Sequence, residues 1–509
     1  MQPALASDRV VAIAGAGAMG SGIAQVAAAA GHRVQLFDAN ASAVAQAIAG
    51  VQAAFEQLAA KGKLDAAAAH AAQARLLPAT TVNDLAGSGL VIEAIVEDLA
   101  AKQQLFRDLE ARVSPDCLLA SNTSSLSITA IAAGLKSPAR LAGLHFFNPA
   151  PRMPLVEVIS GLITDPEVTG TLHSTMLAWG KTPVMARSTP GFIVNRIARP
   201  YYGEALRLLL EGASDSATLD AIFREAGGFR LGPFELMDLI GLDVNLAVSK
   251  SVWSAFSNDP RYAPSLIQEE LVAAGFLGRK SGRGFYTYGE GAPVPQANSL
   301  PTQALPASPL VFADAPLASA LSKRLQARGL PFQHADTSPD GRVAEAGGAA
   351  LYLTDGRSAT ERAARKGVAN TLIVDLALDY DSATRLAIAA AQQCSPAALA
   401  AGVGLLQAAG FAVSRLADVP GLAVMRTVCM LANEGAEAVY QQVCDVPAVD
   451  QAMRLGTNYP RGPLAWADQI GLKQVRRVLG NLARSYGEDR YRISPLLAHK
   501  VFSRTRFHA

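Results

Sequence analysis

The first half of the chain alternates short apolar runs with longer segments in which apolar residues recur every three or four positions. The segments "MGSGIAQVAAAAG" (19–31) and "LAAKQQLFRDLEARV" (99–113) have this helical spacing. The short runs between them are typical of buried strands, namely "RVVAIAG" (9–15), "HRVQLFD" (32–38), "LVIEAIV" (90–96) and "CLLASN" (117–122). Alternation of this kind predicts a parallel, doubly wound α/β sheet.

From about residue 190 the hydrophobic pattern becomes helical throughout. The segments "GFIVNRIARPYYGEALRLLLEGA" (191–213) and "LDAIFREA" (219–226) have apolar residues three and four apart, which predicts a mostly helical domain. Residues 289–310 are rich in Pro, Gly, Ser and Ala and are typical of a linker.

Beyond the linker the helical pattern recurs. A shift of 230 positions superimposes residues 190–242 on 420–472 without a gap, and at least twelve of the 53 positions are identical. Only about three would be expected from average composition, at roughly one match in sixteen. The sequence therefore predicts a duplicated helical domain. The identities include Pro190/Pro420, Gly191/Gly421, Arg196/Arg426, Glu204/Glu434, Gly232/Gly462 and Asp238/Asp468.

A glycine-rich turn joins the first strand to the first helix. In this context a GxGxxG pattern predicts a dinucleotide site, because glycine permits a tight turn and a close approach of the backbone to a pyrophosphate at the helix N-terminus. Asp38 closes the second strand, where a carboxylate accepts hydrogen bonds from the adenosine ribose and repels a 2′-phosphate, so we expect NAD rather than NADP. The loop residues are Gly15, Gly17, Ala18, Met19 and Gly20.

Composition supports an enzyme and limits its partners. The 45 basic and 43 acidic residues are interspersed, which provides no general field for nucleic acid or a membrane surface. The four cysteines are scattered, no signal peptide is visible at the amino end, and no uncharged apolar run is long enough to span a bilayer. We therefore expect a cytoplasmic protein. Apart from His145, which is considered below, the histidines are isolated, and no metal site is predicted.

Candidate chemistry lies in two stretches after the dinucleotide motif. "LLASNTSSLSI" (118–128) ends a strand with a polar cluster that contains Ser124, and "RLAGLHFFNPAPRMPLVEVI" (140–159) contains His145 and Glu157. A histidine can take a hydroxyl proton near neutral pH, and a carboxylate can fix its tautomer. On residue types alone, a hydrogen-bonded core histidine is as good an interpretation as a general base.

The order and the amino-acid sequences of these motifs resemble those of the L-3-hydroxyacyl-CoA dehydrogenase family over residues 8 to about 288. The resemblance rests on "GAGAMGSGIA", "SNTSSL", "GLHFFNPAPRMPLVEVI", "PGFIVNRI", "GPFELMDLIGLD" and "GRKSGRGFYTY". It implies oxidation of an (S)-3-hydroxyacyl-CoA to the 3-ketoacyl thioester, with NAD as cofactor and an acyl-CoA as the ligand. It also implies an NAD-binding domain followed by a helical dimerisation domain.

The resemblance assigns roles to individual positions. It implies His145 as general base, Glu157 as its paired acid, and Ser124 and Asn195 as the groups that hold the substrate oxygen. Lys61 matches a lysine that meets coenzyme A. The matched cofactor contacts are Glu97, Lys102 and Asn148.

The second copy lacks the matching chemistry. The 230 shift places Asp375, Ala387 and Met425 at the positions of the histidine, the glutamate and the asparagine, and no second GxGxxG is present. We therefore expect a scaffold that supplies, within one chain, an interface that a shorter relative obtains by dimerising. A homo-oligomer through the helical domains is also left open.

The domains that we predict follow from these motifs. They are an NAD-binding Rossmann domain over 1–188, an all-α domain over 189–288, a linker over 289–310, a degenerate α/β segment over 311–415 and a second helical domain over 416–509.

The long layout resembles that of bacterial enzymes of phenylacetate degradation that act on 3-hydroxyadipyl-CoA. The alternative is a 3-hydroxybutyryl-CoA dehydrogenase, with the same chemistry on a short uncharged chain. A non-catalytic NAD-binding structural protein is disfavoured, because the first module keeps all the candidate residues. A phosphosugar or β-hydroxyacid dehydrogenase would instead rely on a lysine base.

Overall fold

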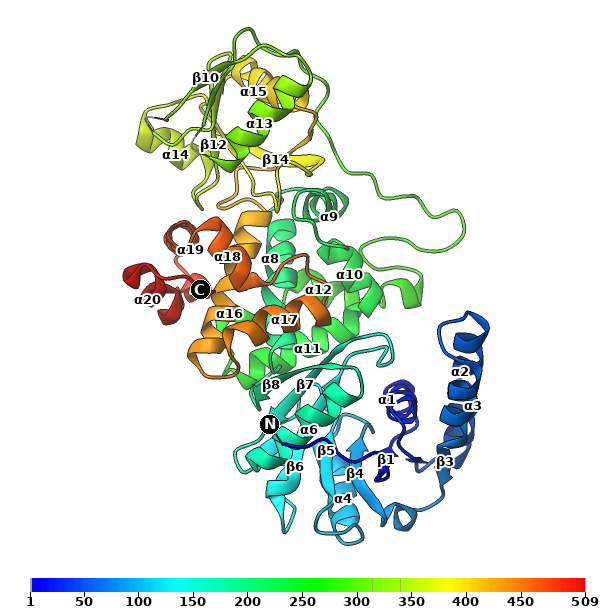
Figure 1. Cartoon of the computed structure of the whole chain (residues 1–509). Coiled ribbons are helices and arrows are strands. Elements are labelled where there is room, and N and C mark those ends of the chain that lie inside the picture. The colour runs from blue at the N-terminus through cyan, green and yellow to red at the C-terminus, as the bar shows by residue number, and fades with distance from the viewer. Residues whose placement is uncertain (1, 314, 339, 509) are drawn as a thin grey trace. The chain divides into compact units, whose positions relative to one another are not determined.

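The computed structural model describes residues 2–313, 315–338 and 340–508, and the chain forms two compact units (Figure 1). The first unit extends to Arg196 and includes the later segment Gln441–Thr457. The second holds Ile197–Tyr440 and the chain from Asn458 onward. None of the described helices is both long enough and apolar enough to cross a membrane.

The first unit is built on an eight-stranded sheet in the order β3-β2-β1-β4-β5-β6-β7-β8. All neighbouring strands are parallel except β6 and β7, so the predicted doubly wound α/β fold is confirmed with one antiparallel pair added. The strands are β1 Val10–Ala14, β2 Val34–Phe37, β3 Leu76–Ala79, β4 Ser88–Glu93, β5 Leu118–Ser121, β6 Leu141–Phe146, β7 Leu155–Ser160 and β8 Thr182–Arg187. The helices are α1 Ala18–Ala29, α2 Ala41–Ala60, α3 Ala66–Ala74, α4 Leu99–Glu110, α5 Ile128–Ala132, α6 Pro166–Ala178 and α7 Val194–Ile197.

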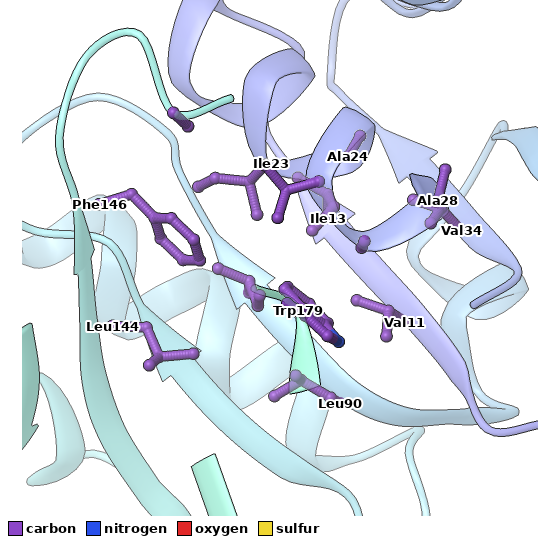
Figure 2. Close-up of a cluster of buried hydrophobic side chains, with 14 of the residues drawn as sticks. Val11, Ile13, Ile23, Ala24, Ala28, Val34, Leu90, Leu144, Phe146 and Trp179 are labelled. Atoms are coloured by element: carbon purple, nitrogen blue, oxygen red, sulfur yellow. The ribbon is translucent and has the colours of Figure 1, made fainter. Parts of the chain in front are cut away.

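Small side chains on α1 allow that helix to lie close to the sheet. Ala24 and Ala28 are fully buried, and Ile23 is buried with them against the apolar residues of β1 and β4 (Figure 2). A strand that is buried on both faces has to be apolar throughout, which is why these strands appear in the sequence as continuous apolar runs. The packing fixes the N-terminus of α1 beside the end of β1.

The second unit contains the helices of both copies. From the first copy these are α8 Arg199–Leu210, α9 Ser216–Glu225, α10 Pro233–Ile240, α11 Leu242–Ala255 and α12 Leu266–Ala273. From the second they are α16 Val424–Tyr440, α18 Pro463–Ile470, α19 Leu472–Tyr486 and α20 Pro495–Ser503, while α17 Val446–Gly456 belongs to the first unit.

The segment between the two sets of helices in the sequence forms a seven-stranded sheet. This sheet is a reduced version of the first one. Its order is β10-β9-β11-β12-β13-β14-β15, and its last four strands have the relative directions of β5 to β8. The strands are β9 Leu310–Phe312, β10 Gln333–Ala335, β11 Ala344–Ala346, β12 Ala349–Leu353, β13 Thr371–Val374, β14 Arg385–Ala390 and β15 Ala412–Arg415. The helices with it are α13 Pro316–Ala327, α14 Ala359–Lys366 and α15 Pro396–Ala408.

The two copies make matching contacts in the 230 register. In the first unit the Arg187 amide donates to the Val443 carbonyl at 2.8 Å, and in the second unit the Ala417 amide donates to the Ala213 carbonyl at 2.9 Å. The second hydrogen bond is the counterpart of the first, because the donor now comes from the second copy and the acceptor from the first. Likewise α17 packs on β7 and β8, whereas α9 packs on β14. Each sheet is therefore covered by a helix from the other copy.

Two buried glutamates show the same exchange within the second unit. Glu204 on α8 and Glu434 on α16 have no solvent exposure. Each accepts hydrogen bonds from an Arg-Tyr pair of the opposite copy. The distances are 3.4 Å from Arg490 and 2.9 Å from Tyr491 to Glu204, and 3.2 Å from Arg261 and 2.6 Å from Tyr262 to Glu434.

Candidate active site

The glycine loop leaves open space where a dinucleotide would approach. Gly15 has φ +117°, and a Cβ there would lie 2.3 Å from the Ala94 carbonyl oxygen. A Cβ on Gly20 would lie 1.8 Å from the Gly15 oxygen, so both positions require glycine. A Cβ on Gly17 would meet nothing within 4 Å, and this open side faces away from the packed turn.

The other dinucleotide residues lie next to this loop. Ala18 and Met19 form the first turn of α1, whose free amides are available to an anion. Asp38 follows β2, and its carboxylate accepts from the amides of Ala16 at 2.8 Å and Asn40 at 2.9 Å. The carboxylate is thereby fixed beside the turn, as ribose recognition requires. The residues present fit a dinucleotide.

His145 and Glu157 are brought together by the antiparallel pair β6 and β7. They lie directly opposite each other in the register, and Nδ1 of His145 is 2.6 Å from Oε2 of Glu157. His145 is 6% exposed and Glu157 is fully buried. The carboxylate holds the proton on Nδ1, which leaves Nε2 as the basic nitrogen. This is the arrangement of a general base.

The second oxygen of Glu157 has a different partner. Oε1 accepts from the backbone amides of Ile193 at 3.0 Å and Val194 at 2.9 Å, where α7 begins. The same carboxylate therefore orients the histidine and closes the start of the helix that carries Asn195.

Ser124 and Asn195 also lie close together. The Asn195 side-chain amide donates to the Ser124 carbonyl oxygen at 3.4 Å. The loop around Ser124 is held by Glu97, whose Oε1 accepts from the Ser124 amide at 3.0 Å and from the hydroxyls of Thr123 at 2.6 Å and Ser125 at 2.9 Å. The sequence resemblance gave Glu97 a cofactor contact, and the structure adds this loop-holding contact.

Lys102 is a buried cation between two glutamates. Its Nζ lies 2.5 Å from Glu93 and 3.3 Å from Glu97. Burial raises the pKa of Glu97, but the Thr123 hydroxyl and the charge of Lys102 outweigh burial, and the pKa lies below its ordinary value. Glu93 also accepts from the Ser121 hydroxyl at 2.6 Å. Sequence reasoning missed Glu93, although a buried acid at the end of an apolar strand is a signal for a partner.

Two of the predicted site residues stand apart from this cluster. Asn148 is exposed, three positions beyond His145. Lys61 is the exposed C-cap residue of α2, with no hydrogen bond or ion pair from its side chain to the described residues. The structure leaves both free to meet a ligand but does not join them to His145.

The second copy also contributes a contact near His145. The ring of Phe147 lies 4.5 Å from the ring of His145. A Cβ placed on Gly456, at the end of α17, would lie 2.8 Å from Leu155, 3.0 Å from Val194 and 3.6 Å from Phe147. The end of α17 therefore contacts residues around the His145–Glu157 pair.

In the second copy the matching positions carry one acid and no histidine. Asp375 is fully buried, and its carboxylate accepts from the amides of Ala423, Val424 and Met425 at 2.8–3.0 Å. Ala423 and Val424 are the counterparts of the two amides that bind Glu157. Asp375 thus keeps the helix-closing contact and lacks the imidazole.

A dinucleotide loop and a buried histidine–glutamate pair on one sheet define the class of protein: an NAD-dependent dehydrogenase. Residues 10–189 match the NAD-binding domain of 3-hydroxyacyl-CoA dehydrogenase, and residues 191–288 and 421–506 match its C-terminal domain. Residues 351–420 match the reduced Rossmann-fold domain of 3-hydroxybutyryl-CoA dehydrogenase.

Similar proteins have either the full layout or its first module. The 3-hydroxyadipyl-CoA dehydrogenase of Escherichia coli K12 is 43% identical over 97% of both chains. A crystal structure of a 3-hydroxybutyryl-CoA dehydrogenase from the same organism has 42% identity and a TM-score of 0.89, and covers 98% of this chain and 99% of that one. A probable 3-hydroxybutyryl-CoA dehydrogenase of Bacillus subtilis is 39% identical over 55% of this chain and 97% of its own.

The chain belongs to the 3-hydroxyacyl-CoA dehydrogenase family. It is an NAD-dependent oxidoreductase that oxidises a 3-hydroxyacyl-CoA.

Proposed function

We propose that the chain oxidises (S)-3-hydroxyadipyl-CoA to 3-oxoadipyl-CoA in phenylacetate catabolism. The observation that carries the choice of substrate is the similarity to the 3-hydroxyadipyl-CoA dehydrogenase, which extends over 97% of both chains. The 3-hydroxybutyryl relative from Bacillus aligns with only 55% of this chain and lacks the second copy.

The proposed roles follow from the geometry around His145. Nε2 takes the proton of the 3-hydroxyl group while the C3 hydride leaves, and Glu157 stabilises the imidazolium. Ser124 and Asn195 hold the oxygen as it becomes a carbonyl. NAD, when bound, accepts the hydride.

The proposed ligand contacts come from other residues of the first unit. The loop from Gly15 to Gly20 meets the pyrophosphate of NAD, and Asp38 meets the ribose. Glu97, Lys102 and Asn148 complete the cofactor side. Lys61 meets a phosphate of coenzyme A.

A second substrate is supported by the name of the full-length structural relative, a 3-hydroxybutyryl-CoA dehydrogenase. The two possibilities are separated by kcat/KM for the two thioesters, measured from NADH absorbance. We expect the adipyl substrate to be preferred by at least about tenfold, since a contact made only to its terminal carboxylate is worth roughly 1.4 kcal/mol or more. A preference for the C4 thioester would overturn the proposal for the substrate and leave the reaction class intact.

We also propose that the enzyme works in the cytoplasm. The four cysteines are all free thiols, which suits a reducing compartment. Fractionation of cells that produce the protein tests this location.

A further inference from the structure

The second unit contains a cavity at the carboxyl edge of its reduced sheet. The cavity has a volume of about 320 Å³ and begins where β12 ends at Leu353. Leu376 and Leu378, which follow β13, form one side, and Trp466 and Ile470 of α18 form another. In open α/β sheets, ligands bind outside the carboxyl ends of the strands.

The cavity occupies the active-site position of the second copy. In the 230 register, Leu376 and Ala377 correspond to Phe146 and Phe147, the residues after His145. Asp375, at the histidine position, uses its carboxylate on backbone amides. A cavity lies beside the strand end, and the imidazole of the first copy has no counterpart at this position.

The lining is suited to an uncharged apolar group. Three leucines, an isoleucine and a tryptophan form its apolar part, and two glutamines line its edge. Gln469 donates to the Leu378 carbonyl and Gln474 to the Thr354 carbonyl, both at 3.3 Å. Asp379, Asp381 and Lys323 also line the cavity, and Lys323 pairs with Asp381 at 2.9 Å. The remaining charge is that of Asp379, which disfavours a ligand with a carboxylate at its end.

A row of cations on α19 adjoins the cavity. Arg477 donates to Oε1 of Gln474 at 3.3 Å, so the two features share a hydrogen bond. Arg477 lines a second, open hollow of about 490 Å³ between α19 and α20, and the described residues that line it include no carboxylate. The cations that line this hollow are Lys473, Arg476, Arg477 and Arg484. None of them forms an ion pair with another residue in the described part of the chain.

These cations are not inherited from the duplication. Their first-copy counterparts are Asp243, Leu246, Ala247 and Ser254, which carry one negative charge and no positive one. Four positive charges without a carboxylate favour a ligand with several negative charges.

We propose that the cavity and the cationic row form a non-catalytic binding site for a coenzyme A thioester with a short, uncharged acyl chain. The acyl group enters the cavity beside Trp466, and the phosphates lie along Arg476 and Arg477. The choice of a thioester rests on the proposed function, because the first module acts on ligands of this class. No bond is made or broken at this site.

Binding stoichiometry tests the site without depending on turnover. Butyryl-CoA, which has no 3-hydroxyl group to oxidise, is titrated by calorimetry into the full chain in the absence of NAD. Ser319 is exposed on α13 and lines the cavity, so Ser319→Trp fills its mouth. Gln326→Trp, exposed on the same helix and outside the cavity, is the matched control. We expect Ser319→Trp to bind one molecule fewer per chain than the native protein and Gln326→Trp to bind the same number.

A charge-reversed variant tests the second half of the site. Arg476→Glu with Arg477→Glu should weaken this butyryl-CoA binding at least tenfold, and Lys366→Glu, at an exposed position of α14, should not. Equal stoichiometry in the native protein and Ser319→Trp overturns the site. Binding of tripolyphosphate as tight as that of butyryl-CoA also overturns it, since the row would then bind any polyanion.

The test of this binding site is independent of the test of the proposed function. NADH formation from 3-hydroxyadipyl-CoA is measured on the same preparations, and Ser319→Trp should retain it. Native protein that forms no NADH counts against the proposed function, whereas the difference in stoichiometry is decided by calorimetry alone.

Discussion

At the scale of single residues, the first copy has a carboxylate that binds both a histidine and backbone amides. The second copy has a carboxylate that binds only the amides. Glu157 pairs with the imidazole and with the amides at the start of α7. Asp375 binds the equivalent amides from the neighbouring strand. Because Asp375 makes this contact without a histidine, the amide contact does not require an imidazole.

We expect Glu157→Gln and His145→Gln each to lower kcat by about two orders of magnitude or more, because general base catalysis contributes roughly 10²–10⁴-fold. NAD binding, measured by fluorescence titration, should be retained in both variants. Circular dichroism confirms folding. Near-normal turnover in a folded variant would contradict the role of the pair.

Asp375 should make stability depend on pH. Burial raises the pKa of this carboxyl to about 6, against the hydrogen bonds that lower it. A raised pKa favours the protonated group in the folded state, so the stabilisation is present at low pH and is lost as pH rises through about 6. The free energy of unfolding that is lost in this way amounts to roughly 3 kcal/mol.

Asp375→Asn carries a neutral group at every pH and should lack this dependence. Scanning calorimetry of both proteins between pH 4 and 7 checks it. The melting temperature of the native protein should fall relative to that of the variant over this range. A constant difference would show that Asp375 is ionised throughout.

Residue types predicted part of the site. His145 and Glu157 stand out as polar residues in apolar strands, and Asp38 stands at a fixed distance from the glycine loop. The contact of Glu97 with the Ser124 loop and the Lys102–Glu93 pair depend on how separate strands and α4 come together, which local sequence does not encode. The role of Asn195 came from the family resemblance alone.

At the scale of elements, the alternation of strands and helices was predictable, but the place of α17 was not. The duplication makes α17 the counterpart of α9, and the sequence pattern does not indicate which sheet it packs on. Instead α17 packs on β7 and β8 of the first sheet. Burial of its apolar face decides this, and the same face would fit any apolar sheet surface.

The contact at the end of α17 is tight enough to test. Gly456→Val places carbon within about 3 Å of Leu155 and Val194, so one of them has to move. Because Val194 donates to Glu157, we expect kcat/KM to fall by about tenfold or more while the fold is retained. Gly50→Ala on α2, where a Cβ meets nothing within 4 Å, is the control and should be neutral. Unchanged kinetics in Gly456→Val would exclude an influence of α17 on the site.

At the scale of the whole chain, the second copy supplies partners for the first. Glu204 on α8 meets Arg426 at 2.6 Å, as well as the Arg-Tyr pair, and all three partners lie after residue 420. Breaking a buried pair by removing one partner is strongly destabilising. The short relatives match only about 55% of this chain, and so they lack these residues.

A chain cut after residue 290 should therefore associate with itself. The face of α8 that packs on α16 would be exposed, and a second truncated chain can offer an equivalent helix. Size-exclusion chromatography with light scattering should report a dimer. A stable, folded monomer would show that α8 needs no partner.

Joining the copies in one polypeptide, as the exchanged bonds from Arg187 to Val443 and from Ala417 to Ala213 imply, has a consequence for how the protein can evolve. In an assembly of identical subunits every substitution occurs on both sides of the symmetry axis. In a fused chain each half accumulates changes alone, and dilution does not separate the halves. One half can therefore lose an imidazole or gain a row of arginines while the other continues to turn over substrate.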